Sequence, residues 1–485
     1  MRGWRVEAEV MAQDLFLYEN ISEQLTSHIR SGSYRSGERL PSVRALSKLF
    51  GVSINTVIQS LRKLEMDGYV EIRERSGAFV CGSLPPDRTS PAVVHFPMLP
   101  VDVSLSEDIL RYMEPHVSAG TLHLGIALPA AELMPVQRIM RLFREMTRRQ
   151  PQAVWDYSHP NGMASFTRQL SHRSLHHEAP VAESDILVTN GCMEAIELAL
   201  RTVTRRGDVV AVETPTYYGS LLALEVLQRR ALEIPTHYRD GLCLYSLEQA
   251  FRRGQVKACL VSCNAQNPLG FSMSVERKRR LVELASRYQV PLIENDIWGD
   301  TVYSGESLPA KAFDRDGMVI YCSSFSKSLM PGLRLGWVAA GRFHGRLREL
   351  KQISSITTAA APQMVVGRLM ESGAYAQHLQ QLRSRLQAQV RAMIEIVRQS
   401  FPSGTQVHEP QGGCVLWVRL PDKGDARALF ERALECGIHV FPGSVFSAGS
   451  NHHDFLRLNA GNPVSPEIEA KLRSLGRLAS SMLSN

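Results

Sequence analysis

Short apolar runs alternate with helical segments from about residue 120 onward, and this alternation restricts the possible folds more than any other feature of the chain. Helical segments such as Met193–Arg205 and Val275–Tyr288 lie between several of the runs. Strands that are apolar on both faces are typical of a parallel sheet covered by helices. The pattern therefore predicts a parallel α/β domain. The runs, none of which holds a charged residue, are Ile186–Thr189, Val209–Val212, Ala258–Ser262, Pro291–Ile293 and Met318–Cys322.

The α/β domain is predicted over residues 119–485. Its last part, from about residue 375, begins with a long helix at about 376–399 and continues with mixed strands and helices. This change of pattern indicates a small α+β lobe. At roughly 150 residues per domain, a chain of 485 residues is expected to hold about three domains.

A compact helical unit is predicted ahead of this domain, over residues 14–82. Apolar residues recur every four positions from Ile21 to Ile29 and form one helix face. Ser42 and Ser53 are placed to cap two further helices with a glycine turn between them. Residues 69–80 then predict a strand, a turn and a return strand. Two helices joined by a short turn and followed by a hairpin are typical of a winged helix-turn-helix.

Residues 83–118 are predicted to form an extended linker between the two units, because prolines are spaced through the segment at Pro85, Pro91 and Pro97.

Composition excludes several classes of protein. No run of about 18 uncharged apolar residues is present, so no membrane span is expected. The first residues carry no signal peptide pattern, and eight cysteines without a CxxC pair do not form a disulfide framework. We therefore expect a cytoplasmic protein. The net charge of +7 is compatible with nucleic acid but is not specific to it.

Lys327 lies in the segment with the clearest chemical signal, residues 323–337 (SSFSKSLMPGLRLGW). A lysine that follows a strand among hydroxyl groups, with an arginine seven residues later, suits a cofactor that carries an aldehyde and a phosphate. The lysine amine forms a Schiff base with such an aldehyde. Ser324, Ser326 and Arg334 are expected to bind phosphate oxygens through charge-assisted hydrogen bonds.

A second phosphate-binding position is predicted where the run Ile186–Thr189 ends and a helix begins. Gly191, Cys192 and Met193 lie at this helix start. Free backbone N–H groups and the helix dipole favour an anion there.

These segments together resemble the fold type I pyridoxal-phosphate (PLP) enzymes, and residues 213–217 (ETPTY) and 264–270 (NAQNPLG) extend the resemblance. It implies that Lys327 carries PLP, that Tyr217 stacks on the cofactor ring and that Asn267 hydrogen-bonds the ring hydroxyl. It also implies that Tyr157 reaches the phosphate of the neighbouring subunit in a homodimer. Arg457 resembles the arginine that pairs with the carboxylate of an amino substrate, where a bidentate guanidinium suits better than a lysine.

The segment Glu294-Asn295-Asp296-Ile297-Trp298 departs from this family. The family has an Asp, three residues before a Tyr, that keeps the pyridine nitrogen protonated and the ring an electron sink. In this register Asn295 takes the place of the Asp, and Trp298 that of the Tyr. Asp296 serves instead if the strand end is shifted by one residue, so both are candidate cofactor contacts. The departure disfavours efficient transamination and leaves cofactor binding intact.

The N-terminal unit resembles the GntR-type winged helix-turn-helix through residues 40–46 (LPSVRAL), 51–57 (GVSINTV) and 76–80 (SGAFV). The resemblance implies that Arg44, at one helix start, reads DNA, and that the start of the next helix faces the groove or the phosphates through Ser53, Asn55 and Thr56. It also implies that the wing tip, Arg75-Ser76-Gly77, approaches the minor groove. The family often has an arginine where this chain has Ile54. A winged helix used for protein contacts is the alternative. The residues assigned to DNA are Arg44, Ser53, Asn55, Thr56, Ser76 and Gly77.

A winged helix fused to an aminotransferase-like domain is the architecture of MocR-type regulators in the GntR family, which the chain resembles. This implies a PLP-binding homodimer that binds a double-stranded DNA operator and senses an amino acid, an amine or PLP itself. The alternative is a working aminotransferase with a DNA-binding appendage. The pairs His176-His177 and His452-His453 are predicted to lie on the surface, and no acidic or cysteine cluster beside them indicates a metal site.

Overall fold

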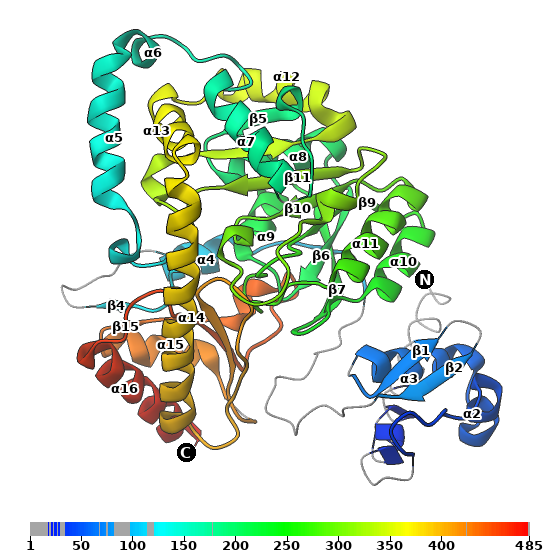
Figure 1. Ribbon diagram of the computed structural model, residues 1–485. Helices are drawn as coiled ribbons and strands as arrows, with labels where there is room; N and C mark the ends of the chain where they lie inside the picture. Colours follow the sequence, from blue (N-terminus) through cyan, green and yellow to red (C-terminus); the bar gives the residue numbers. More distant parts are fainter. Residues whose placement is uncertain are drawn as a thin grey trace. The chain divides into compact units, whose positions relative to one another are not determined.

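The structure is a computed structural model that describes residues 18, 21–22, 24–26, 28–29, 34–66, 68–73, 76–81, 98–113, 121–176, 178–422 and 424–483. The chain divides into two compact units, Met1–Thr89 and Ser90–Asn485 (Figure 1). The predicted wing residue Arg75, His177 and the prolines at 85, 91 and 97 lie outside the described residues.

The N-terminal unit has the predicted winged helix-turn-helix elements. Ser42 Oγ accepts a hydrogen bond from the Ala45 N–H at 3.3 Å and caps α2 (Val43–Phe50). Ser53 caps α3 (Ile54–Met66) in the same way. An antiparallel hairpin follows, made of β1 (Val70–Arg73) and β2 (Gly77–Val80). The predicted apolar faces form the core of the unit, with Ile21, Leu25, Ile29, Leu46, Val57, Leu61 and Leu64 all buried.

A nine-stranded sheet lies at the centre of the described part of the C-terminal unit. Its main path runs β3-β7-β6-β9-β10-β11-β12-β5, and the short β8 (Gly241–Leu242) pairs with β7. The strands on the main path are β3 (Val101–Asp102), β5 (Ile186–Thr189), β6 (Val209–Thr214), β7 (Arg230–His237), β9 (Val256–Val261), β10 (Leu292–Asn295), β11 (Val319–Ser324) and β12 (Gly336–Ala339).

The prediction of a parallel sheet is confirmed for five neighbouring strands, β7, β6, β9, β10 and β11. It is wrong for three others, because β12 runs antiparallel to β11 and β5, and both β3 and β8 run antiparallel to β7. The reason is the connection before β12. A parallel return needs a crossover, usually a helix, and the segment 325–335 between β11 and β12 holds only a short 3-10 helix (Pro331–Leu333).

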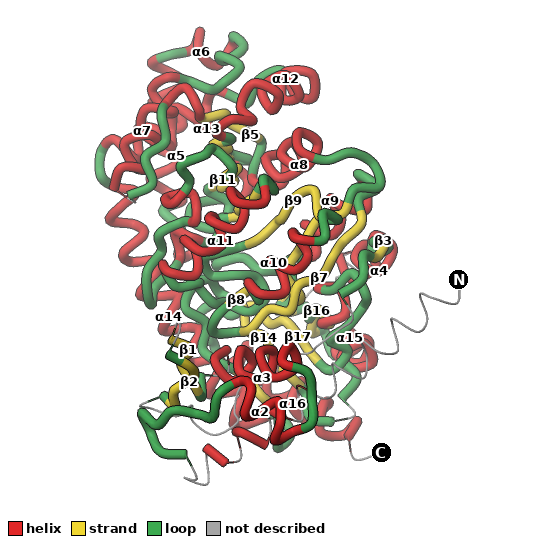
Figure 2. The backbone as a smooth tube through the Cα atoms, turned by 90° about the vertical axis from the view of Figure 1, so that its right-hand side faces the viewer, coloured by secondary structure: helices red, strands yellow, loops and turns green. Residues whose placement is uncertain are grey.

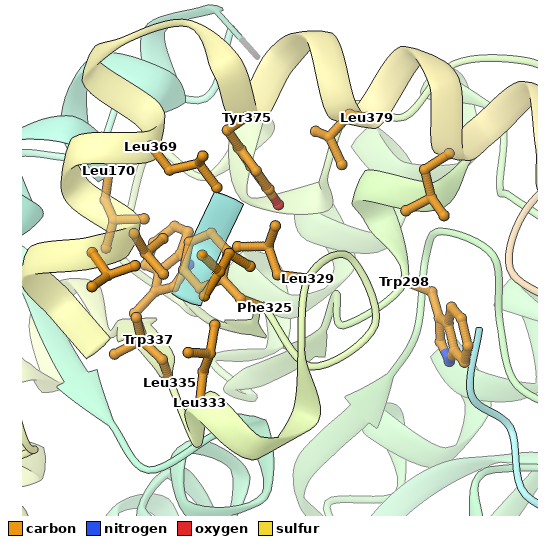
Figure 3. Close-up of a cluster of buried hydrophobic side chains, with 14 of the residues drawn as sticks. Leu170, Trp298, Phe325, Leu329, Leu333, Leu335, Trp337, Leu369, Tyr375 and Leu379 are labelled. Atoms are coloured by element: carbon orange, nitrogen blue, oxygen red, sulfur yellow. The ribbon is translucent and has the colours of Figure 1, made fainter. Parts of the chain in front are cut away.

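Helices cover this sheet: α8 packs on β10, β11 and β12, α9 and α10 pack on β7, and α11 lies next to α10 (Figure 2). On the other side, α7 and the start of α14 enclose a cluster that includes Leu170, Phe325 and Trp337 (Figure 3). The helices are α5 (Val136–Arg149), α6 (Pro151–Trp155), α7 (Ala164–His176), α8 (Cys192–Val203), α9 (Tyr218–Val226), α10 (Leu244–Arg252), α11 (Val275–Tyr288), α12 (His344–Ser355), α13 (Ala360–Glu371) and α14 (Ala374–Ser400).

The predicted small lobe is an antiparallel sheet of order β13-β14-β17-β16, and α14 extends from the large sheet to pack on its α16 (Figure 1). A chain segment ahead of the large sheet also joins the lobe, because β4 (Leu122–His123) pairs with β15 in parallel. The lobe elements are β13 (Gln406–Val407), β14 (Val415–Arg419), α15 (Ala426–Glu435), β15 (Ile438–His439), β16 (Phe441–Pro442), β17 (Phe455–Asn459) and α16 (Pro466–Leu483).

The predicted extended linker, residues 83–118, is wrong for its described part. Residues 101–113 form β3 and a helix, α4 (Ser106–Met113), that buries Ile109 and Tyr112. The Glu225 carboxylate accepts hydrogen bonds from the Leu105 and Ser106 N–H groups at 2.8 and 3.0 Å and so holds the start of α4. Burial of these apolar side chains outweighs the extended tendency that the spaced prolines indicate.

His452 also differs from its predicted surface position. Its side chain is buried against Trp417, and its Nε2 lies 3.4 Å from Thr214 Oγ1. Within the described residues, no helix is long and apolar enough to cross a membrane.

Candidate cofactor and DNA sites

Lys327 follows β11 and points toward the chain segment that precedes α5. Its Nζ donates a hydrogen bond to Ala127 O at 2.7 Å and lies 5.3 Å from the centre of the Trp298 ring. Burial lowers the pKa of this amine to about 8, and the positive charges of Arg457 and Arg334 act in the same direction. A substantial neutral fraction near neutral pH makes Lys327 a competent nucleophile toward an aldehyde.

The predicted phosphate loop lies at the start of α8. Gly191 precedes the helix at φ 101°, and a Cβ there would lie 2.8 Å from Arg334 Nη2. Arg334 donates to Asn190 O at 2.8 Å, so its guanidinium lies directly on this loop. Glu194 accepts from the Asn190 N–H at 2.6 Å and is held in turn by the buried Lys351 at 3.0 Å. Glu194 and Lys351 therefore hold the backbone of this loop in place. The free N–H groups at the start of α8 suit an anion.

Asn295 and Asp296, the two residues predicted to contact the pyridine nitrogen, lie in different surroundings. Asn295 ends β10, and its Oδ1 lies 3.4 Å from Cys192 Sγ at the start of α8. Asp296 instead accepts from Asn264 Nδ2 at 3.0 Å and from Tyr321 OH at 2.7 Å. Its carboxyl lines a separate pocket with residues such as Leu170, Arg173, Asp300 and Trp337.

Arg457 is fully buried on β17 beside the loop that carries Asn267. Its Nη1 donates to Asn267 Oδ1 at 3.2 Å, and its Nη2 donates to Gly125 O. The guanidinium carbon lies 5.1 Å from the ring centre of Phe441 and 4.8 Å from that of Phe446. Arg457 Nε is buried and has no hydrogen-bond partner in the described chain. An unused donor on a buried cation is suited to an anionic ligand.

Tyr217 and the predicted serines lie around the same site. Tyr217 immediately precedes α9, and burial raises the pKa of its hydroxyl, so the ring is neutral. Ser324 and Ser326 are buried, and Ser324 Oγ accepts from the Ser326 N–H at 3.4 Å. Ser324 also lines the separate pocket beside Asp296.

Tyr157 is not brought to this site within the subunit. Its side chain is 80% exposed and follows α6, where Trp155 is 85% exposed. The structure therefore leaves Tyr157 free to contact another molecule.

The residues assigned to DNA lie mostly on the surface of the N-terminal unit. Arg44, Ser53, Asn55 and Ser76 are exposed. Thr56 differs from its predicted position, because its side chain is buried and its hydroxyl lies 2.7 Å from Ser53 Oγ. Helical geometry explains this, since a residue three positions after the cap turns toward the core.

The wing tip needs a glycine. Gly77 has φ 108°, and a Cβ there would lie 2.9 Å from Arg39 Nε. The side chain of Arg39 therefore lies against the wing and adds a positive charge there. Arg39 was not among the residues that the sequence predicted to bind DNA.

Two families match the chain in succession. "Bacterial regulatory proteins, gntR family" matches residues 17–80, and "Aminotransferase class I and II" matches residues 122–473. The "Uncharacterized HTH-type transcriptional regulator YdcR" of Escherichia coli is 34% identical over 469 residues, with 95% of this chain and 98% of that protein covered. The chain belongs to the MocR-type regulators of the GntR family.

Solved aminotransferases share the fold of the C-terminal unit of this MocR-type regulator. A multiple substrate aminotransferase from Thermococcus profundus is 27% identical with a TM-score of 0.72, covering 79% of this chain and 96% of that one. LysN, an α-aminoadipate aminotransferase from Thermus thermophilus complexed with N-(5'-phosphopyridoxyl)-L-leucine, is 26% identical with a TM-score of 0.71, covering 79% and 100%. The cofactor of the MocR-type regulator is accordingly PLP.

The residues of this regulator fit that cofactor. The fit rests on the buried Lys327 amine, the Gly191 loop with Arg334 against it, and the unused Nε of Arg457. These groups supply an amine for the aldehyde, donors for the phosphate and a cation for a ligand carboxylate.

Three contacts around the site were not singled out from the sequence. Ala127 and Gly125 accept hydrogen bonds from Lys327 and Arg457 through backbone oxygens, which any residue type provides. Burial raises the pKa of the Cys414 thiol, and the nearby positive charges of Lys327 and Arg457 act in the opposite direction. The backbone oxygens of Gly125 and Ala127 follow β4, which is held in place by its pairing with β15. Strands of two residues are too short to show a hydrophobic period, so the sequence could not predict this pairing.

Proposed function

We propose that this MocR-type regulator binds a double-stranded DNA operator as a homodimer in the cytoplasm and senses an amino compound, or PLP itself, through Lys327. The observation that carries the proposal is the joint burial of the Lys327 amine and the partly unpaired Arg457 guanidinium in a chain that also holds a winged helix. PLP supplies, when bound, an aldehyde and an electron-withdrawing ring. An α-amino acid offers the matching pair of groups, an amine and a carboxylate.

Each side chain then has a distinct role. Lys327 would hold the cofactor through its amine, and the aldehyde of the cofactor would supply the group with which an amino compound reacts. Arg457 binds a carboxylate through the donor that the protein leaves unused. The N–H groups of Gly191 and its successors, with Ser324, Ser326 and Arg334, hold the phosphate, and Asn267 and Tyr217 contact the ring.

The exposed aromatic residues around α6 support the homodimer. Trp155 and Tyr157 are each at least 80% exposed, and large aromatic side chains are enriched where two protein surfaces meet. Tyr157 of the partner subunit would complete the phosphate site. A two-fold dimer also presents two winged helices to two half-sites.

Operator binding tests the proposal. The intergenic DNA beside the regulator's own gene is titrated with PLP-loaded wild type and with Lys327→Ala, each with and without a panel of amino acids. The matched control compounds are the corresponding carboxylic acids without the α-amino group. We expect an amino acid to change the Kd of the wild type only. An equal response of Lys327→Ala would contradict sensing through this amine.

A working aminotransferase is the second candidate, because a lysine with a pKa of about 8 suits a general base. Asn295 and Trp298 favour the regulator over the working aminotransferase. Asn295 has no carboxylate to keep the ring nitrogen protonated, and Trp298 has no hydroxyl like that of the family's Tyr. Multiple turnovers of an amino donor and a keto acid by the purified protein would establish the second candidate.

A further inference from the structure

The amide of Asn295 is held in one orientation by the backbone. Its Oδ1 lies 3.3 Å from the Ile297 N–H, and a backbone N–H can only donate. If the amide were flipped, two donors would face each other in a buried place. The oxygen of Asn295 therefore faces Ile297.

Cys192 holds the same oxygen from the start of α8. Its Sγ lies 3.4 Å from Asn295 Oδ1, and because that atom accepts, the thiol donates. Burial raises the pKa of the Cys192 thiol, and the nearby Asp296 acts in the same direction. The thiol thus keeps the proton that it needs as a donor.

The other end of the amide has a free donor. Asn295 is 5% exposed, and in the described chain its Nδ2 makes no hydrogen bond. A buried donor of this kind normally has an acceptor.

We infer that Asn295 Nδ2 donates a hydrogen bond to the pyridine nitrogen of PLP and holds that nitrogen unprotonated, with Cys192 as the positioning residue of the amide. The inference rests on the proposal that Lys327 carries PLP in this site. A donor at this place requires a lone pair on the ring nitrogen, whereas a carboxylate would require a proton there.

Asp296 does not supply the missing carboxylate. Both of its oxygens are taken, by Asn264 and Tyr321, in the separate pocket. An unprotonated ring withdraws electrons weakly, so proton removal from a bound amino acid is slow. The Asn295 amide and the Cys192 thiol therefore favour binding of an amino acid over its chemical conversion.

The protonation state of the ring nitrogen tests the inference directly. Holoprotein is prepared with PLP labelled with ¹⁵N in the ring, and the ¹⁵N chemical shift is measured by NMR at neutral pH. We expect the shift of an unprotonated, hydrogen-bonded pyridine in the wild type. Asn295→Asp is expected to move the signal to the position of a pyridinium.

The role of Cys192 is tested with a matched set of variants. We expect Cys192→Ala to move the ¹⁵N signal away from its wild-type position and Cys192→Ser to restore it. Cys259→Ala, which removes a buried thiol on β9, is expected to leave the signal unchanged. An unchanged signal in Cys192→Ala would overturn the positioning role.

Two further outcomes separate this inference from the proposed function. Borohydride reduction followed by peptide mapping reports whether PLP is attached to Lys327. PLP attached there with a protonated ring nitrogen in the wild type would overturn this inference alone. A protein without PLP on Lys327 would overturn both.

Discussion

Arg457 Nη1 donates to Asn267 Oδ1 at 3.2 Å, which joins the predicted carboxylate-binding arginine to the predicted ring-hydroxyl ligand. The two residues come from different parts of the unit, Arg457 from β17 of the small lobe and Asn267 from the loop after β9 of the large sheet. A ligand that draws Arg457 toward its carboxylate changes this contact. This contact is therefore one of the polar links between the small lobe and the loop that carries Asn267, together with the hydrogen bond between His408 Nε2 and Leu269 O.

Replacement of Lys327 by Ala should remove the covalent attachment of PLP. We expect the holoprotein's visible absorption and its borohydride-reducible adduct to disappear, because the replaced side chain has no amine. Lys257→Ala, at an exposed position on β9, is the matched control and should keep both signals. A reducible adduct in Lys327→Ala would mean that another lysine carries the cofactor.

The attachment of PLP to the apoprotein should accelerate as pH rises. The neutral amine is the nucleophile, and burial lowers the pKa of Lys327 to about 8, so its neutral fraction grows through that pH and then levels off. Stopped-flow absorbance across the pH range measures the rate. A profile that rises only near the ordinary lysine pKa of about 10.4 would contradict the effect of burial.

Replacement of Arg44 by Ala should weaken operator binding by about 1–3 kcal/mol, the range for loss of a bidentate contact to a base. Arg44 is exposed at the second residue of α2, away from the PLP site in sequence and in domain. The visible spectrum should therefore stay unchanged. Fluorescence anisotropy with operator and random DNA measures the effect, and an equal loss on both would show that Arg44 contacts only phosphate.

Conversion of bound PLP to its amine form by an amino acid should be slow in the wild type, on the scale of minutes to hours, against a typical enzyme turnover of about 10 per second. Asn295→Asp should accelerate it, because a carboxylate stabilises a protonated ring. Asp296→Asn, at the neighbouring position in the separate pocket, should change it little. Collapse of cofactor affinity in Asp296→Asn would identify Asp296 as the true partner.

The holoprotein should be a homodimer at micromolar concentration. Trp155→Asp should shift it toward monomer, since a charge replaces an apolar side chain that is 85% exposed on one subunit. Val226→Asp, at another exposed apolar position on α9, serves as the control. Analytical ultracentrifugation gives the mass, and a monomeric wild type would contradict the shared site.

The sequence predicts the elements that have a strong local signal. β5 and α11 have the predicted bounds, and the predicted helix at about 376–399 is α14, Ala374–Ser400. β7 (Arg230–His237) was missed because its two charged residues interrupt the apolar run. α4 was missed because the prolines around it indicate an extended chain, whereas long-range burial of Tyr112 determines the helix.

The site residues were predictable where the side chain itself carries the chemistry, as for Lys327 and Arg457. The orientation of Asn295 was not, since it depends on the Ile297 N–H and on a thiol more than a hundred positions earlier in the chain. The burial of His452 likewise follows from packing partners that no local pattern reveals.

The anchoring of α4 by Glu225 also bears on the spacing of the half-sites that two subunits can bind. The described residues from 98 onward belong to the larger unit, and the winged helix is described up to Cys81. At about 3.5 Å per residue, the chain from Cys81 to Met98 cannot span more than about 60 Å. Half-sites one helical turn apart are separated by about 34–36 Å. Operator spacing is thus limited by the length of this stretch of chain, and each residue deleted from it should narrow the range of spacings that two winged helices can bridge.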